Sequence, residues 1–575
     1  MWRGLKKSRA YCSAAIATVY AVFGTAALAQ TPYPAIIPPG GTPIPQLAPS
    51  SHPTVGPDLA SPGQVRPVDV AGQVAIKRVR FSGVTVLSAA ELEATPGMLT
   101  GPAVTIADIE RARATIVTKY RERGFVFVTA DATVEADGTL HFRIVEGFVS
   151  EVRLDGDVGP AGAQVLRFLN RLLNVGPLNV ATMERQLLLA QDIPGLTVRT
   201  VLRPAGSAPG ALSLIAQVSR RTVTGYLAAD NRASPYSGPE QGLAAVQFNS
   251  FTTLAEQTEI ALFHGRGSTQ AFGQASWRGF IDDSGLQARL YAGHGANNPS
   301  GALRSLGYEG TSTVAGGSLI YPLIRQRSQT LNLVGAFDVS KSDIWVKGAD
   351  ESRLRLSQDN QGIIRAGVDW TIFDVLAGET RPATNFLNMR ISQGVSGSLG
   401  DHPSRIGAEG NFTKIGWEAS RTQTLFAPWP GAVFAVQGTV AGQWTDDILP
   451  LSEKFYLGGN RLGRGFYAGE MTGDRAVAVS GELQLTTSHQ FNGFNLGLRL
   501  VPTYYIFADA GWTFENLAVD PNQRLHSFGL GVRMQVNERF EVQLEAARRF
   551  ADQTQSLAAQ SSQQDRFFWR VLARF

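Results

Sequence analysis

The stretch FGLGVRMQVNERFEVQLEAA, residues 528–547, decides the fold class of this chain. Apolar side chains occupy every second position on either side of Asn537-Glu538-Arg539, and glycine, alanine, arginine, glutamine and glutamate fill the positions between them. Alternation with a period of two places the apolar side chains on one face of a β-strand and the polar ones on the other. The stretch therefore predicts two antiparallel strands joined by a tight turn, with one apolar face and one wet face.

The end of the chain shows the same pattern with added aromatic residues. The apolar face of this last strand consists of Phe567, Trp569, Val571, Ala573 and Phe575. Arg570 and Arg574 lie on the other face. An apolar face flanked by aromatic side chains is typical of a strand in contact with lipid. We therefore expect Phe567, Trp569 and Phe575 to form the C-terminal signal of a membrane barrel.

Short alternating strands fill residues 222–575, as residues 286–293 again illustrate. A soluble sandwich would alternate too. A sheet within hydrocarbon, however, must pair all its backbone groups, so it must close on itself. The 354 residues of this region accommodate roughly 14–18 strands of about 9–11 residues with their connections. The pattern predicts a transmembrane antiparallel β-barrel of about 16 strands.

The first 29 residues predict export. They begin with four basic residues and no acidic one, continue with an apolar run from Ala14 to Ala27, and end on Ala27-Leu28-Ala29. This three-part pattern is that of a cleaved signal peptide, 1–29, although a membrane anchor helix is the alternative. Beyond it no run of roughly 18 apolar residues occurs, so the mature protein is either soluble or enters a membrane as strands. Together with the alternation, this predicts a bacterial (Gram-negative) outer membrane.

Composition excludes several other functions. The excess of four bases lies in the signal, so the remaining 48 bases and 48 acids give no support for nucleic-acid binding. The only cysteine, Cys12, also lies there, which excludes disulfides, cysteine–zinc sites and a thiol nucleophile from the mature chain. The seven histidines are scattered without metal-ligand spacing, and no G-x-S-x-G motif occurs. We expect no enzyme activity, no metal and no cofactor.

Two small modules precede the barrel. Residues 30–75 are proline-rich and predict an extended linker. Residues 76–148 and 149–220 each predict an α+β module with the order β-α-α-β-β. The first module has a strand at 77–81, a helix at 106–123, and strands at 126–134 and 140–145 joined at Asp137-Gly138. The second has a strand at 151–154, helices at 165–173 and 180–192, and strands at 196–202 and 212–218.

This organisation resembles the two-partner secretion transporters of the ShlB/FhaC/HecB type, in which polypeptide-transport-associated (POTRA) domains precede a barrel. GYLAADNR at 225–232, with YSG at 236–238, resembles the start of that family's first barrel strand. DIPGL at 192–196 resembles the helix end of its second POTRA domain. LGGNRLGRGF at 457–466 resembles the sixth extracellular loop, which folds into the lumen. FADAG at 507–511 resembles the strand that receives the arginine of that loop.

The resemblance implies a site made of two motifs. The lumen loop motif is Gly463, Arg464, Gly465 and Phe466, and the receiving strand motif is Phe507, Asp509 and Gly511. An arginine among glycines can approach a wall closely, and its planar guanidinium can bind Asp509 through two parallel hydrogen bonds. Glu482 is a second acceptor candidate. The alternatives are an ordinary glycine-rich hairpin loop, or a phosphate-binding loop, which would need a βαβ context that is missing here.

The function implied is an outer-membrane pore that recognises and translocates a large exoprotein of haemolysin, haemagglutinin or adhesin type. Its partners would be this unfolded exoprotein in the periplasm, captured by strand addition at a sheet edge, the outer-membrane lipid and the barrel-assembly machinery. The alternative is an assembly factor that inserts other barrels, against which the count of two modules argues. A passive porin would leave residues 76–220 unexplained. The proline-rich segment departs from the family's N-terminal plug helix, so the presence of a plug stays open, as does the cargo's identity.

Overall fold

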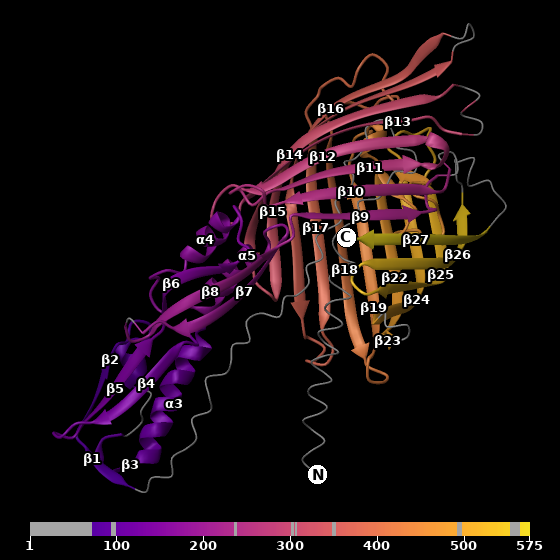
Figure 1. The fold of residues 1–575 in the computed structure, drawn as a ribbon. Coiled ribbons are helices and arrows are strands. Elements are labelled where there is room, and N and C mark those ends of the chain that lie inside the picture. The colour runs from indigo at the N-terminus through magenta and orange to yellow at the C-terminus, as the bar shows by residue number, and fades with distance from the viewer. Residues whose placement is uncertain are drawn as a thin grey trace.

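The computed structural model describes residues 72–575 apart from short stretches at 94–98, 207, 235–237, 301–303, 305–306, 348–351, 492–496 and 553–563. The predicted signal peptide, nearly all of the predicted linker, and Tyr236 and Ser237 of the first-strand motif lie outside the described residues. Figure 1 shows two small modules, indigo to magenta, that extend from one end of a large barrel.

The first module packs one long helix on a three-stranded sheet. Its elements are β1 Gln73–Ile76, β2 Arg78–Ser82, α2 Ala89–Glu93, β3 Gly101–Thr105, α3 Ile106–Glu122, β4 Val128–Val134 and β5 Thr139–Glu146. The sheet order is β2-β5-β4, with β2 parallel to β5. The Thr105 hydroxyl accepts a hydrogen bond from the Asp108 N–H and so caps α3, which buries Ile116 and Tyr120 against the sheet. The predicted helix and hairpin are therefore present.

Two strands of this module, β1 and β3, were not predicted, and the short helix α2 was part of the predicted order but had no residues assigned to it. The linker prediction ran to residue 75, but residues 73–75 belong to β1, which pairs with β3, because Ile76 is 2% exposed and anchors the strand in the module core. The short helix α2 begins with a capping box in which Ser88 and Glu91 bond each other's backbone N–H. The Arg123 guanidinium, followed by the Ser88 backbone and hydroxyl, lowers the pKa of Glu91 to about 2. The S-x-x-E spacing was the available signal for this helix.

The second module has the predicted order of elements. They are β6 Phe148–Gly156, α4 Gly162–Asn170, α5 Val180–Gln191, β7 Leu196–Pro204 and β8 Ala211–Arg220, in a sheet of order β6-β8-β7. Asn179 caps α5 by accepting from the Ala181 N–H. Helix α4 ends at Asn170, before the predicted 173. Leu173 instead forms a β-bridge with Val149, and the chain then turns at Asn174, which has a φ of 53°.

The predicted barrel is confirmed as a closed antiparallel ring of 16 strands. They are β9 Val223–Asp230, β10 Gln241–Asn249, β11 Gln257–Gly265, β12 Gln270–Phe280, β13 Gln287–Asn297, β14 Glu309–Arg325, β15 Gln329–Lys347, β16 Arg353–Asp374, β17 Ala383–Gly394, β18 Thr413–Phe426, β19 Ala432–Trp444, β22 Arg475–Thr487 with its continuation β23 His489–Phe491, β24 Leu498–Phe514, β25 Gln523–Val536, β26 Phe540–Asp552 and β27 Asp565–Arg574. β22 and β23 count as one strand because both pair with β24. β27 pairs with β9 and closes the ring.

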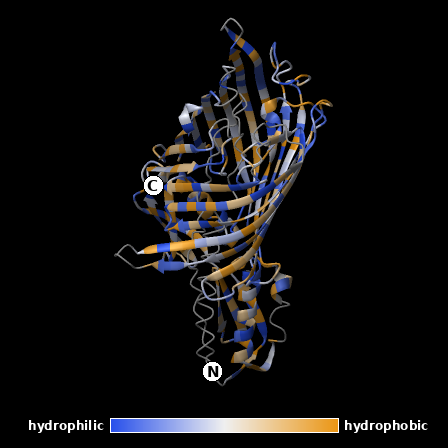
Figure 2. Cartoon of the chain, turned by 90° about the vertical axis from the view of Figure 1, so that its right-hand side faces the viewer, coloured by the Kyte–Doolittle hydropathy of each residue, from blue (hydrophilic) through white to orange (hydrophobic). Residues whose placement is uncertain are grey.

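The alternation that predicted the strands separates the outer wall from the lumen. On β25, Phe528 and Leu530 are 52% and 61% exposed on the outside, while Arg533 points inward and contacts Glu482 of β22. Figure 2 shows orange and blue residues alternating along the barrel strands. No helix among the described residues combines the length and apolar character needed to cross a membrane.

The order of the strands also orients the barrel. The modules precede β9, so the connection that follows β9 lies at the end of the barrel away from them. Successive strands alternate in direction, so the connections after β15, β17, β19 and β24 lie at that same far end. The connections after β10, β12 and β14 lie at the near end.

The second module packs directly against the near end of the barrel. Ala255, just before β11, and Phe280, the last residue of β12, belong to the same buried apolar cluster as Phe168 and Leu189 of the module. The Phe168 and Phe280 rings meet edge to face with centroids 5.2 Å apart. The module and the barrel therefore share one core at their junction.

Candidate functional site

The connection between β19 and β22, residues 445–474, folds back into the lumen. Within it β20, Phe455–Leu457, pairs with β21, Met471–Gly473, as a small antiparallel hairpin. Leu457 and Met471 are buried in one cluster with Leu525 of the barrel wall. The hairpin thus holds the segment between its two strands, 458–470, against the inner wall.

Glycines shape the tip of this segment. Gly458, Gly459 and Gly463 have φ values of 100°, 111° and 77°, which other residues rarely adopt. The Gly458 N–H donates to the Leu462 carbonyl at 3.0 Å, and the Gly459 N–H to the Phe466 carbonyl at 3.0 Å. A Cβ on Gly458 would lie 2.1 Å from a backbone oxygen. The tight turn therefore depends on glycine and presents the next side chain, Arg464, to the wall.

Arg464 and Asp509 form the predicted side-on pair. Arg464 Nε lies 3.1 Å from Asp509 Oδ2, and Nη2 lies 2.9 Å from Oδ1. The Arg464 backbone N–H also donates to Oδ2 at 2.7 Å, and the Ser480 hydroxyl donates to Oδ1 at 2.8 Å. The guanidinium carbon lies 3.8 Å from the centre of the Phe507 ring. Arg464 is only 4% exposed, so the lumen there is closed around the pair.

Glu482 is brought to the same guanidinium. Its carboxylate accepts from Arg464 Nη1 and from Arg533 Nη2 of β25, and the Gln484 amide donates to it at 2.8 Å. Arg533 in turn stacks over Tyr505, with its guanidinium carbon 4.3 Å from the ring centre. Asp509, Arg464, Glu482 and Arg533 therefore form a row of alternating charges that connects the loop to β22, β24 and β25.

Arg232, in the connection after β9, was not predicted as a site residue. It donates from Nη1 to the carbonyls of Gly459 and Arg464, at 2.8 and 2.9 Å, and pairs through Nη2 with the buried Glu545. Its guanidinium also lies 4.1 Å from the Phe568 ring centre. Arg232 therefore binds the loop backbone to the first and last strands of the barrel. Its place in the quoted first-strand motif was the only signal in the sequence.

The remaining residues of the two motifs pack the loop closely. Phe466 is fully buried beside Leu457 and Leu525. The Gly465 N–H donates to the Ser527 hydroxyl at 3.2 Å. A Cβ on Gly511 would lie 2.7 Å from the Leu457 side chain. These glycines let the loop lie directly on the wall.

The start of the loop is bound to the opposite part of the wall. The Glu453 carboxylate accepts from Arg365 of β16 at 2.8 Å and lies 2.8 Å from the Lys414 ammonium of β18. The Ser452 hydroxyl accepts from the Gln361 amide at 2.7 Å. The loop therefore spans the lumen, with polar contacts from β16 on one side to β24 on the other.

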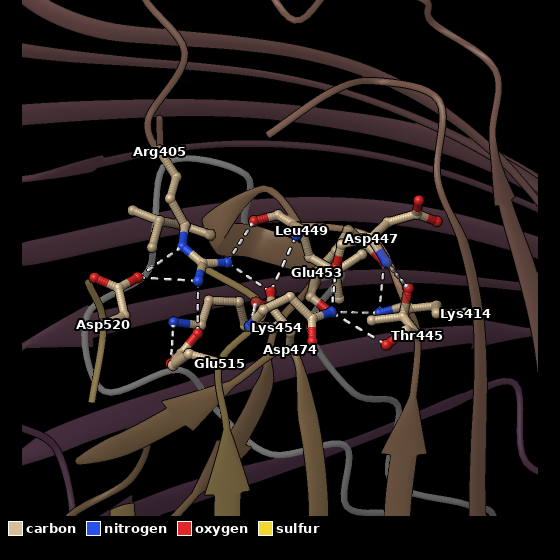
Figure 3. Close-up of polar contacts among 12 residues, drawn as sticks. Arg405, Lys414, Thr445, Asp447, Leu449, Glu453, Lys454, Asp474, Glu515 and Asp520 are labelled. Atoms are coloured by element: carbon tan, nitrogen blue, oxygen red, sulfur yellow. Dashed lines mark hydrogen bonds and ion pairs between the residues drawn. The ribbon is translucent and has the colours of Figure 1, made fainter. Parts of the chain in front are cut away.

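A second cluster closes the outer end of the loop (Figure 3). Arg405, in the connection after β17, donates to Asp474 at 2.5 Å, to Glu515 at 2.6 Å and to Asp520 at 3.0 Å. Asp474 also accepts from the Leu449 N–H at 3.0 Å. Arg405 is 7% exposed, so one cation joins three connections at the far end of the barrel. It was missed because its partners lie 44 to 115 residues away in the chain.

The C-terminal residues lie at the barrel seam. Phe567 and Phe575 are 60% and 61% exposed on the outer wall, and Trp569 shares their face. Phe575 and Gly225 exchange both backbone hydrogen bonds at 3.0 Å. The chain end therefore completes the pairing of the last strand with the first.

A cavity of about 290 Å³ lies between the loop and the wall. Its lining includes Trp417, Arg390, Lys414 and Arg461. Arg461 pairs with Glu418, so this cavity is polar as well as aromatic. Within the part of the chain that the structure describes, no group of His, Cys, Asp and Glu is arranged to hold a metal ion.

Comparison with known proteins places this geometry among secretion proteins. The profile of the family "Haemolysin secretion/activation protein ShlB/FhaC/HecB" matches residues 214–534, and that of the "POTRA domain, ShlB-type" matches residues 74–147. CdiB from Escherichia coli has the same fold, with a TM-score of 0.68 and 18% identity over 90% of this chain and 94% of that one. CdiB from Acinetobacter baumannii gives a TM-score of 0.60 and 16% identity over 88% and 91%. No curated protein sequence matches the chain.

Proposed function

Because the chain belongs to the haemolysin secretion/activation family ShlB/FhaC/HecB, and so is an outer-membrane transporter of two-partner secretion, we propose that its lumenal loop holds the barrel in a transport-competent state. The POTRA region faces the periplasm and the partner is a secreted exoprotein. The connections at the far end of the barrel are accordingly extracellular.

The Arg464–Asp509 pair carries the proposal for the loop. Arg464 makes its hydrogen bonds from a turn that only glycines allow. Its side chain donates to Asp509 of β24 and to Glu482 and Ser480 of β22. All these hydrogen bonds are polar, so water can replace them when a polypeptide displaces the loop and opens the lumen. The loop thus holds the wall strands in position and leaves the lumen when the exoprotein passes through it.

The periplasmic modules supply the entry site. We assign residues 73–147 and 148–220 to two POTRA domains, and the family match at 74–147 supports the first. β4 and β7 each pair with only one neighbour, so each leaves one row of backbone groups for an added strand. An unfolded exoprotein large enough to be a haemolysin, haemagglutinin or adhesin can extend these sheets before it enters the barrel.

Further parts of the proposal concern partners and chemistry. The aromatic C-terminal strand, ending on Phe575, supports insertion into lipid by the barrel-assembly machinery. Transport proceeds without ATP or any cofactor, and the chain carries no enzymatic activity. The driving force is then the folding of the exoprotein outside the cell.

One experiment separates the loop's role from folding of the barrel. Arg464→Ala should leave the barrel inserted and heat-modifiable on gels but abolish secretion of the exoprotein encoded with it. Normal secretion by this variant would refute the role. Depletion of the whole protein should remove one exoprotein from the medium, whereas general loss of outer-membrane proteins would indicate an assembly factor instead.

A further inference from the structure

The hairpin of β15 and β16 carries a basic surface at the level of the outer-leaflet headgroups. These strands have 19 and 22 residues, against 8 to 11 in the five strands β9 to β13. Figure 1 shows the hairpin reaching farther from the modules than the other strands. Because the connection after β15 is extracellular, the additional length lies on the extracellular side.

The outer face of β15 changes character along its length. Outward-pointing residues up to Val339 are apolar, and Leu333, Phe337 and Val339 are 40%, 49% and 42% exposed. The next outward position is Lys341. On the two neighbouring strands its partners are Thr313 and Asn360, which also follow apolar positions. The apolar band therefore ends at the same row on three adjacent strands.

Strand geometry places this row at the membrane surface. From Leu331, the first outward apolar residue of β15, to Lys341 the strand spans about 33 Å at about 3.3 Å per residue. At a tilt of about 40° this is about 25 Å along the membrane normal, the height of the apolar band of an outer-membrane barrel. Lys341 and the residues beyond it therefore lie among the headgroups of the outer leaflet.

Basic residues gather around one tryptophan above this row. Trp345 is stacked by two guanidinium groups, with the Arg353 and Arg355 carbons 4.6 and 4.7 Å from its ring centre. Register places both arginines on the same face as Trp345 and Lys347. Arg353 also pairs with Glu309 at 2.8 Å, and Asp343 lies 3.6 Å from Arg355 and 3.8 Å from Lys341. Among the described residues of this surface, the four bases exceed the two carboxylates.

The cations of this surface remain available to a ligand. The side chains of Lys341, Arg353 and Arg355 are 55%, 56% and 38% exposed, although each has a carboxylate beside it. Stacking on Trp345 fixes the planes of both guanidinium groups, so the paired N–H donors of each group are already oriented to bind an oxyanion. Phosphate matches such forks with paired hydrogen bonds.

We propose that Lys341, Arg353 and Arg355, arranged around Trp345, bind the phosphate groups of the lipopolysaccharide of the outer leaflet. The surface faces away from the lumen, so it does not serve the path of the exoprotein. The inference rests on the location in the outer membrane and is independent of the role proposed for Arg464.

Binding of defined lipids to the purified full-length transporter tests the proposal. Bisphosphorylated lipid A should bind the triple variant Lys341→Gln/Arg353→Gln/Arg355→Gln at least tenfold more weakly than the wild type. The matched control Arg80→Gln/Arg111→Gln/Arg121→Gln removes three exposed cations from the first module and should bind like the wild type. Heat-modifiable migration shows that each variant contains a folded barrel.

Several outcomes would overturn the proposal. Equal affinity of the triple variant and the wild type would show that these cations do not bind the lipid. Equal binding of lipid A stripped of its phosphates would exclude phosphate recognition. Competition by inorganic phosphate below millimolar concentration would indicate a site for free anions. If Arg353→Lys/Arg355→Lys binds lipid A with wild-type affinity, the stacked guanidinium groups have no specific role. A partial loss of affinity would support that role.

Discussion

Asp192 at the end of helix α5 and Arg325 at the end of strand β14 form a side-on ion pair, with Nε 2.7 Å from Oδ2 and Nη2 2.7 Å from Oδ1. The two side chains are 30% and 18% exposed. This pair connects the second module to a periplasmic connection of the barrel, beside the shared apolar core of Phe168 and Phe280. The proposed binding of an exoprotein strand to this module would thereby take place at the entrance of the lumen.

Loss of this pair should loosen the junction without unfolding either part. We expect Arg325→Gln to remove about 1.5–3 kcal/mol of docking free energy, the usual value of hydrogen bonds to charged groups. Hydrogen exchange in α5 should increase and secretion should fall. The control is Arg327→Gln, because Arg327 is 53% exposed and lies 3.7 Å from Glu184. If both variants behave alike, the Asp192 pair has no special role.

The two acceptors of Arg464 should differ in importance. Asp509 receives three hydrogen bonds from Arg464 and one from Ser480, whereas Glu482 shares its carboxylate with Arg533 and Gln484. Removing one partner of a desolvated ion pair costs about 3–5 kcal/mol. We expect Asp509→Asn to reduce secretion more than Glu482→Gln does, measured as exoprotein in the medium at equal barrel abundance. The reverse order would contradict this ranking.

Arg405 should control the extracellular end of the loop. Arg405→Gln leaves Asp474 buried without this cation and leaves Glu515 with Lys454 alone, so the connections after β17, β19 and β24 should separate. We expect protease added outside the cells to cleave residues 445–474 faster in this variant. Arg381→Gln, an exposed substitution at the periplasmic end, is the control. Unchanged cleavage by Arg405→Gln would show that the cluster does not hold the loop.

The barrel seam should tolerate no side chain at Gly225. A Cβ there would lie 2.4 Å from the Phe575 ring and 2.6 Å from the Ala245 carbonyl oxygen. Crowding of this kind typically costs about 1–3 kcal/mol. We expect Gly225→Val to reduce the fraction of heat-modifiable barrel in membranes. Gly242→Val on β10 is the matched control, since the nearest atom to its Cβ is 3.8 Å away; equal losses in both variants would rule out a seam-specific effect.

Much of the site was predictable because its motifs are local. Glycines around Arg464 indicate a tight turn wherever they occur, and Asp509 lies on an alternating strand whose inward face is polar. Arg232 and Arg405 were not predictable in the same way. Their partners come from segments that only the closed ring brings together, and no spacing in the sequence records that proximity.

The sequence by itself determined that the chain forms alternating strands, that two α+β modules precede them and that an arginine-bearing glycine loop interrupts them, because periodicity and turn chemistry depend on neighbouring residues. Only the tertiary structure decided which side chains share the lumen, and it placed Lys341, Thr313 and Asn360 in one row on the outer wall. Closure of the barrel and the tilt of its strands set these positions, because closure and tilt result from strand pairing around the whole ring and not from any single strand.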